Sequence, residues 1–282
     1  MSFNKKERIE VAISCSDCDY IAKVENAGKV FINPEGKQYQ VMHNGILTFT
    51  DSHYGDFNVE IIEKLGGHHE PQEEKVFFEI LKHLRPGATM IELGAFWGYY
   101  SLWFKSQITD SEVYLVEPME TMLKYGIENF KLNNLVGNFS QFAIGKSSLN
   151  DIEFEHWDGK KYLINQINVD SLLNHYRLTK CDILHADIQG FELDMLHGAI
   201  ESLKSKCIMN IFISTHSNPI HYKCLSLLKK YGYFIVAEHN LYESFASDGL
   251  IVATLNPSIG KISISKKRSF INLIKKLKYI FY

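Results

Sequence analysis

Residues 89–100 read Thr-Met-Ile-Glu-Leu-Gly-Ala-Phe-Trp-Gly-Tyr-Tyr, and the fold can be worked out from this stretch. Residues 89–93 form a short apolar run typical of a buried strand, and residues 99–107 have the apolar spacing of a helix. Two glycines, Gly94 and Gly98, flank the turn between them. Glycine permits a tight turn and lets a ligand approach the backbone. The stretch therefore predicts a strand, a ligand-binding turn and a helix.

Strands and helices alternate on both sides of this unit. A helix is expected after Glu70-Pro71, since proline is favoured at the first helical position. Further strands are expected at residues 113–116, 139–144, 183–186, 207–214, 234–238 and 249–254. Further helices are expected at residues 121–132, 169–176, 191–203 and 221–231, with a loop or hairpin insertion at 145–168. This alternation predicts an α/β fold with a doubly wound, mostly parallel seven-stranded sheet, whose ligands bind at the carboxyl ends of the strands.

The region before residue 70 has a different pattern. Alternating apolar residues at Arg8–Ile13, Lys29–Asn33 and Gln38–His43 are separated by turn-forming residues, which predicts strands. We therefore expect a small β-rich N-terminal appendage over residues 1–69, acting as a lid or as a surface for a second copy of the chain. The main domain then covers residues 70–256, and a C-terminal tail covers 257–282.

Composition excludes several classes of protein. The chain has 282 residues, of which 45% are apolar and 22% charged, as in globular proteins. A formal net charge of −3 argues against an electrostatically dominated nucleic-acid binder. The opening residues are polar and no apolar run is long enough to span a bilayer, so we expect a cytoplasmic protein. The five cysteines are unpatterned; Cys15 and Cys18 form one C-x-x-C, interpreted as half-buried cysteines, with a metal or redox role as the alternative.

The net charge hides an uneven distribution. Residues 261–282 carry seven basic side chains and no acid, which leaves −10 for the other residues. On a helical wheel the apolar side chains of this segment share one side, and Lys275 and Lys276 lie opposite. A basic amphipathic helix predicts peripheral contact with the inner face of a membrane or with a partner. The alternatives are a helix packed on its own acidic domain and a disordered end.

Two acidic residues suggest the cofactor. Glu92 stands just before the glycine turn, and Glu117 ends the next predicted strand. A carboxylate at the first position repels a pyrophosphate and suits a cation, while an acid at the second can accept hydrogen bonds from ribose hydroxyls. The third glycine of G-x-G-x-x-G and a phosphate-binding lysine are absent. The pattern predicts S-adenosylmethionine; the alternative is that both are solvated strand-end acids.

The turn also resembles motif I of class I methyltransferases, and it is most similar to the FkbM family, with Phe96 in place of the family's asparagine. Val116-Glu117-Pro118 and Ala143-Ile144-Gly145 resemble the ends of the family's second and third strands, and the resemblance covers about residues 70–255. It implies S-adenosylmethionine-dependent methyl transfer. The cofactor-binding residues expected from both arguments are Glu92, Gly94, Ala95, Phe96, Gly98, Tyr99, Glu117, Pro118, Ala143 and Ile144.

A second motif bears on the acceptor. Residues 184–192 resemble the family signature Lys-x-Asp-x-Glu-Gly-x-Glu, but His185 replaces the lysine and Gln189 the first glutamate. The resemblance implies O-methylation of a small molecule, including sugar hydroxyls in surface glycan or natural-product biosynthesis. The alternatives are an N-methyltransferase and a non-catalytic scaffold that keeps the cofactor fold. The chain contains no Asn-Pro-Pro-Tyr motif, which argues against a nucleic-acid methyltransferase.

Two residues are predicted to be catalytic. Asp187 follows the strand at 183–186 and is expected to bind the acceptor or act as a base; the alternative is an N-cap. His216 follows the strand at 207–214, and an unperturbed pKa near 6.5 would suit a base. The alternative for His216 is a structural role. An alternative is a divalent-metal site held by Asp187, His216, Glu238 and His239, but we assign no metal ligand from the sequence.

Overall fold

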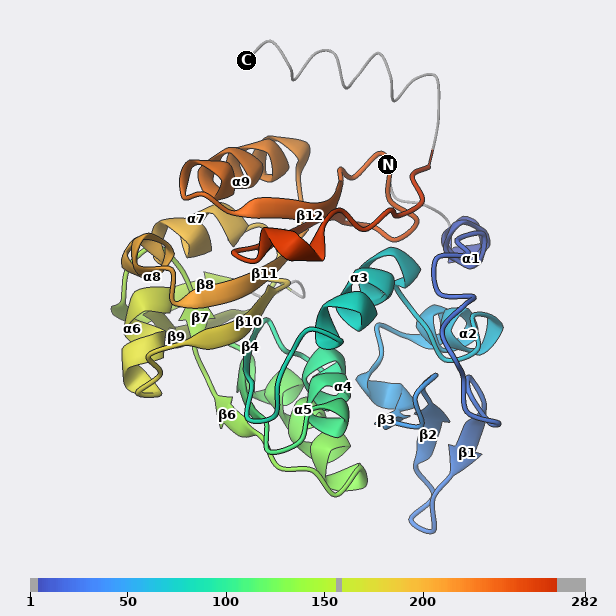
Figure 1. The fold of residues 1–282 in the computed structure, drawn as a ribbon. Helices are drawn as coiled ribbons and strands as arrows, with labels where there is room; N and C mark the ends of the chain where they lie inside the picture. The colour runs from blue at the N-terminus through green and yellow to red at the C-terminus, as the bar shows by residue number, and fades with distance from the viewer. Residues whose placement is uncertain (1–4, 156–158, 268–282) are drawn as a thin grey trace.

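The computed structural model describes residues 5–155 and 159–267. Its main feature is a seven-stranded sheet with the order β12-β13-β11-β10-β4-β5-β6 (Figure 1). The strands are β4 (Thr89–Leu93), β5 (Glu112–Val116), β6 (Asn138–Ser140), β10 (Cys181–Ala186), β11 (Ile208–Thr215), β12 (Phe234–His239) and β13 (Gly249–Thr254). Neighbouring strands from β6 to β11 are parallel, whereas β13 is antiparallel to both β11 and β12. The predicted mostly parallel seven-stranded sheet is confirmed.

Helices cover both faces of this sheet. On one face lie α3 (Pro71–Leu81), α4 (Tyr99–Gln107) and α5 (Glu120–Leu132). On the other lie α6 (Val169–His175), α7 (Glu192–His197), α8 (Ile200–Ser205) and α9 (Asn218–Lys230). Because side chains alternate along a strand, Phe212 enters the first apolar core, and Ile211 and Ile213 enter the second. The order of strands reverses between β4 and β10, which is where such sheets bind ligands.

The N-terminal region contains helices as well as strands. A three-stranded antiparallel sheet comprises β1 (Val30–Ile32), β2 (Gln38–Val41) and β3 (Leu47–Phe49) and includes two of the predicted strands. It is accompanied by α1 (Lys5–Ile13), α2 (Asp56–Lys64) and the short 3₁₀ helix η1 (Thr50–Ser52). The strand predicted at Arg8–Ile13 is wrong. Its alternation is outweighed by helical spacing, since Ile9 and Ala12, three residues apart, are the buried residues.

Two predicted elements are divided in the structure. The strand expected at 139–144 becomes β6 and β7 (Ala143–Ile144), because β7 leaves the main sheet and pairs with β9 (Lys161–Ile167). With β8 (Leu149–Glu155), β9 forms the hairpin foreseen at 145–168. The helix expected at 191–203 divides at Gly198, whose carbonyl accepts a hydrogen bond from the Asp170 amide at 3.0 Å.

The described part of the C-terminal tail lies on the domain. After the short helix η2 (Pro257–Ile259), Ile262 and Ile264 pack against the apolar core. The Lys266 ammonium pairs with the carboxylates of Glu238 at 3.1 Å and Glu243 at 3.2 Å. These contacts match the alternative of a tail packed on its own acidic domain. The predicted amphipathic helix falls mostly on residues 268–282, outside the described residues. Within the described part of the chain, no helix is long and apolar enough to cross a membrane.

Candidate active site

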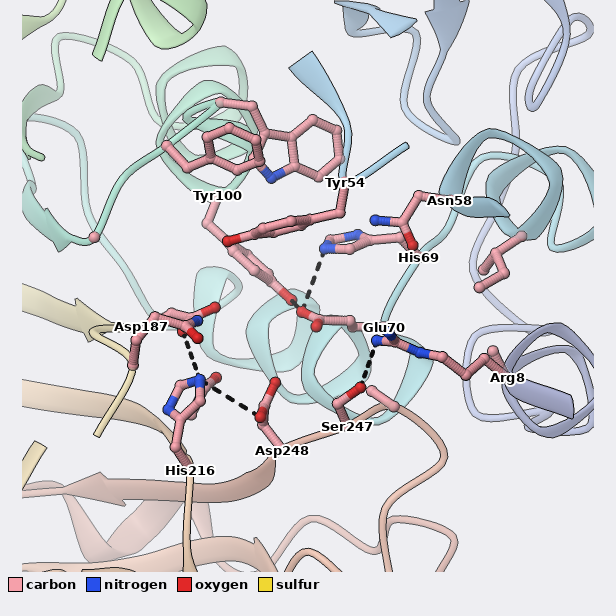
Figure 2. A pocket seen from close by; sticks show the side chains of 18 of the residues that line it. Arg8, Tyr54, Asn58, His69, Glu70, Tyr100, Asp187, His216, Ser247 and Asp248 are labelled. Atoms are coloured by element: carbon pink, nitrogen blue, oxygen red, sulfur yellow. Dashed lines mark hydrogen bonds and ion pairs between the residues drawn. The ribbon is translucent and has the colours of Figure 1, made fainter. Parts of the chain in front are cut away.

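A cavity of about 480 Å³ opens at the carboxyl ends of β4, β10 and β11 (Figure 2). Its walls on the sheet side come from the turn after β4, from His185 and Asp187, and from Ser214 and His216. Residues of α1, α2 and the segment 245–248 also line the cavity. The Arg8 guanidinium of α1 donates a hydrogen bond of 2.6 Å to the Ser247 hydroxyl. The N-terminal region therefore forms part of the cavity wall.

The glycine turn lines this cavity. Its first glycine, Gly94, was expected to let a ligand approach the backbone, but in the structure it makes room for another strand end. Gly94 has a φ of 71°, and a Cβ there would collide with the carbonyl oxygen of Asp187. The glycine thus allows the ends of β4 and β10 to approach each other. Phe96 also lies in the left-handed region, with a φ of 42°, which is unfavourable for a bulky residue and tolerated better by asparagine. Its ring contacts Tyr54, with centroids 4.6 Å apart.

Glu92 lines the cavity as expected for a cofactor-binding acid. Its side chain is buried, and one carboxylate oxygen accepts a hydrogen bond of 3.0 Å from the Ser101 amide in the first turn of α4. Burial raises the pKa of this carboxyl above its ordinary value. The other carboxylate oxygen keeps acceptor capacity for a ligand. Ala95 and Phe96 of the turn line the cavity beside it.

The other predicted cofactor residues do not line the cavity. Glu117 lies behind the turn, where its carboxylate accepts hydrogen bonds from the Phe96 amide at 3.3 Å and the Met119 amide at 3.0 Å. Burial raises the pKa of Glu117 to about 7. Neighbouring residues that also stay outside the cavity wall are Gly98, Pro118, Ala143 and Ile144. Glu117 therefore contacts the backbone of the turn, whereas Phe96 lines the cavity.

Tyr99 is a correction to the predicted site. Its side chain is fully buried away from the cavity, and its hydroxyl donates to the Glu74 carboxylate at 3.3 Å. The next residue, Tyr100, lines the cavity instead, with its ring 4.4 Å from that of His185. Consecutive helical residues point about 100° apart, so the sequence pair Tyr99-Tyr100 could not show which ring faces the ligand.

The two predicted catalytic residues meet in space. His216 Nε2 lies 3.3 Å from an Asp187 oxygen and 3.5 Å from an Asp248 oxygen (Figure 2). On its other side, His216 Nδ1 lies 2.8 Å from Glu192. Asp187 is not the N-cap of α7, which is Phe191; Gln189 donates to its carboxylate at 3.0 Å. One imidazole is therefore held among three carboxylates, which come from the end of β10, from α7 and from the residue before β13.

Residues 96–235, about half of the chain, match the model of the family described as Methyltransferase FkbM domain. The chain belongs to the FkbM methyltransferase family. It is therefore a methyltransferase.

Solved structures of methylases resemble this FkbM methyltransferase in fold. The ribosomal protein L11 methylase from Lactobacillus delbrueckii subsp. bulgaricus is 15% identical, with a TM-score of 0.43, over 68% of this chain and 82% of that chain. TrmK from M. capricolum, in complex with S-adenosyl-homocysteine, is 14% identical, with a TM-score of 0.39, over 71% of this chain and 73% of that chain. No curated protein matches the chain at a significant level.

The electrostatics of the FkbM methyltransferase site change the expected role of His216. Burial lowers the pKa of this imidazole, but the Glu192 hydrogen bond and the carboxylates of Asp187 and Asp248 outweigh burial and raise it to about 9. Burial raises the pKa of Asp187 to about 8 and that of Asp248 to about 6. The argument that His216 has an unperturbed pKa is therefore wrong. At neutral pH, His216 is a cation that neutralises the acids around it.

Several residues of the site were missed from the sequence. His69 and Glu70, just before α3, line the cavity, and their side chains lie 3.3 Å apart. Glu73 of α3 contacts His185 at 2.7 Å and accepts a hydrogen bond of 2.9 Å from the Ser214 hydroxyl. The run His68-His69-Glu70 was the available signal, but only Glu70-Pro71 was interpreted, as a helix start. His185 is buried and also lines the cavity.

The four residues of the alternative metal site do not all lie close together in the structure. Glu238 lies 3.5 Å from His221 and pairs with Lys266. His239 is buried, and its Nδ1 lies 3.3 Å from the Asn240 carbonyl oxygen. Neither Glu238 nor His239 lines the cavity that holds Asp187 and His216. The four residues therefore do not form one ligand set.

Proposed function

We propose that this FkbM methyltransferase transfers a methyl group from S-adenosylmethionine to a hydroxyl of a small molecule, most specifically a sugar hydroxyl in glycan or natural-product biosynthesis. The observation that carries the proposal is the position of the Asp187–His216 pair, which lines the cavity beside the turn after β4. Methyl transfer to a hydroxyl needs an aligned acceptor and a group that takes one proton. An acid coupled to an imidazole can do both.

The residues present fit the cofactor. A cavity of about 480 Å³ is within the range of small-ligand sites. Glu92 and the turn residues Gly94 and Ala95 would face the amino-acid part of S-adenosylmethionine, whose amino and sulfonium groups are cationic. Glu117, Pro118, Ala143 and Ile144 lie outside this cavity wall and are proposed, from the sequence pattern, to hold the adenosine part, with Glu117 offering its remaining lone pairs to the ribose. When bound, this cofactor supplies the electrophilic methyl group.

Asp187 is proposed to bind the acceptor hydroxyl and to take its proton. His216 positions the Asp187 carboxylate through the 3.3 Å contact, and Glu192 fixes the imidazole from the other side at 2.8 Å. The cationic imidazole favours the charged form of Asp187, while burial favours the neutral form. The pair therefore titrates as a unit with raised pKa values, which places its proton uptake near neutral to mildly alkaline pH.

The charge of the cavity supports a polyhydroxylated acceptor. Glu70, Glu92, Asp187 and Asp248 line it, and among the described lining residues Arg8 is the only lysine or arginine. Carboxylates accept hydrogen bonds from sugar hydroxyls. The same acids would repel the phosphates of a nucleic acid, in agreement with the low basic charge of the domain. These features favour a small neutral acceptor over RNA or DNA.

The test is methyl transfer from labelled S-adenosylmethionine to a panel of sugars, nucleotide sugars and glycans, with the position of the methyl group determined by NMR. We expect an O-methyl ether. An N-methyl product would contradict the hydroxyl acceptor and would leave the methyltransferase assignment intact. No product with any acceptor, while the cofactor binds, would argue against small sugars as substrates.

A peripheral membrane role is proposed for residues 268–282, on sequence alone. This segment keeps four basic side chains and the apolar side described above. Residues 261–267 pack on the domain, and the Lys266 side chain is held there by an ion pair. A polybasic amphipathic segment binds anionic lipid through charge and buried apolar area. This arrangement would hold a cytoplasmic enzyme at the inner face of a membrane that carries its acceptor.

A further inference from the structure

A second cluster of ionisable side chains lies outside the active-site cavity. Cys18, in the turns after α1, meets His68, which precedes α3, and Glu74, in the first turn of α3. One ligand atom from each residue, a thiol sulfur, an imidazole nitrogen and a carboxylate oxygen, lies within 4.8 Å of the others. Their exposed fractions are 3%, 1% and 0%. None of the three lines the active-site cavity, so methyl transfer does not account for them.

One buried polar atom of the cluster has no hydrogen-bond partner in the described part of the chain. His68 Nδ1 lies 2.5 Å from a Glu74 oxygen, but its other ring nitrogen, Nε2, is buried without a hydrogen-bond partner among the described residues. The Cys18 thiol donates to the Pro71 carbonyl at 3.1 Å. Buried polar groups without partners are rare in native proteins, and such a group is usually satisfied by a water or an ion or has a functional role.

The donor set matches zinc chemistry. Cysteine sulfur, histidine nitrogen and glutamate oxygen bind Zn²⁺ at about 2.0–2.3 Å, usually in a four-coordinate tetrahedron. Two atoms bound at such lengths are at most about 4.6 Å apart, so the present spacing needs only a small contraction. A thiolate, a carboxylate and a divalent cation also sum to zero charge. A neutral unit of this kind can be buried without leaving an unpaired charge.

A second imidazole packs beside the three. The His43 ring stacks on the His68 ring with centroids 4.0 Å apart, and His43 Nδ1 lies 3.9 Å from a Glu74 oxygen. It also lies 3.1 Å from the Tyr99 hydroxyl, which contacts the same carboxylate. His43 comes from the loop after β2 and is 1% exposed. The cluster thus draws its groups from three separate segments of the N-terminal part of the chain.

We propose that Cys18, His68 and Glu74 bind a Zn²⁺ ion at a buried structural site. Binding replaces the Cys18 S–H by a zinc–sulfur bond, and the thiol proton leaves to solvent with no change in oxidation state. The ion ties the turns after α1 to the start of α3. Because α3 and the residue before it carry Glu73 and Glu70 into the active site, the zinc site holds one wall of the cavity in place.

The test uses the full chain and metal analysis rather than activity. The purified protein should contain about one zinc per chain, and replacing zinc by Co²⁺ should give visible d–d bands and a near-ultraviolet thiolate-to-cobalt band. Cys18→Ser should lose the metal and the thiolate band. Cys15→Ser is the matched control, since Cys15 is equally buried in the same segment and lies outside the cluster. The Cys15→Ser variant should keep the metal and the thiolate band.

Three results would overturn the proposal. The first is a purified chain that holds no zinc and gives no cobalt bands in excess Co²⁺. The second is a Cys18→Ser variant with the zinc content of the unmutated chain. The third is equal loss of metal in Cys15→Ser and Cys18→Ser. The cobalt spectrum of the unmutated chain decides the matter even if Cys18→Ser does not fold. Chelation of the bound zinc should also lower Tm by several degrees.

Discussion

Two groups of histidines and carboxylates in this protein differ in what surrounds them. The active-site group, Asp187, His216, Glu192 and Asp248, borders a cavity, and the Asp187 and His216 side chains are 31% and 17% exposed. The closed group around Glu74 is fully buried, with two imidazoles and a thiol packed against the carboxylate. In the active-site group, these side chains can exchange protons with a substrate. In the closed group around Glu74, the same kinds of side chain can only hold segments of the chain together.

The largest expected effect comes from Asp187. Asp187→Asn removes the group that takes the acceptor proton, while the amide keeps a similar shape, so kcat should fall about 10²–10⁴-fold. Binding of S-adenosylmethionine, measured by calorimetry, should change little. Asp194→Asn, an exposed position on α7, is the control and should keep full activity. Equal activity of the two variants would remove Asp187 from the chemistry.

In the closed group, Glu74→Ala should act on stability. Removing one partner of a buried ion pair costs about 3–5 kcal/mol, since the other charge stays buried and unpaired. Glu74 also accepts hydrogen bonds from the His69 and Glu70 amides, which would lose their partner. Urea unfolding measures the change. Glu63→Ala on α2 is exposed, and its free energy of unfolding should stay close to that of the unmutated chain.

Glu117→Ala should weaken cofactor binding. Hydrogen bonds to a charged group contribute about 1.5–3 kcal/mol, which corresponds to a roughly 10–100-fold rise in Kd for S-adenosylmethionine. Glu112→Ala, at the opposite, exposed end of β5, is the matched control for calorimetry. Unimpaired binding in Glu117→Ala would defeat the assignment of this acid to the ribose.

The pH profile should separate proton transfer from binding. Burial raises the pKa of Asp187 to about 8, so this carboxyl is protonated below that pH and available as a base above it. We expect kcat/KM to increase with pH up to about 8 and then to level off. The residual activity of Asp187→Asn should lack this rise. A flat profile in the unmutated enzyme would mean that neither member of the Asp187–His216 pair takes the proton.

The smallest effect on catalysis should come from the tail. A chain ending at Lys267 keeps the contacts with Glu238 and Glu243 and loses four basic side chains, each of which contributes about 1 kcal/mol of attraction near an anionic surface. It should keep its activity on a soluble acceptor and lose co-sedimentation with anionic vesicles. If it pelleted as well as the full chain, residues 268–282 would not be a membrane anchor.

Local patterns predicted most of the sheet. Residues 89–93 and 99–107 are the bounds of β4 and α4 in the structure, because an apolar strand, a glycine turn and a helical face are each encoded within a few residues. The N-terminal helix α1 was missed, since a short stretch with alternating apolar residues fits a strand and a helix equally well. The division of the helix at 191–203 depends on a contact with Asp170, which no local pattern reveals.

By itself, the sequence determined the class of the protein and the acids at the ends of its strands, since strand–turn–helix order places Glu92, Glu117 and Asp187 at one edge of the sheet. The tertiary structure alone decided which of these acids face a shared cavity. It brought Arg8, His69 and Glu70 to that cavity from the N-terminal region and placed Tyr99 on the far side. It also set the protonation of His216, because a pKa depends on burial and on charges that meet only when distant segments pack together.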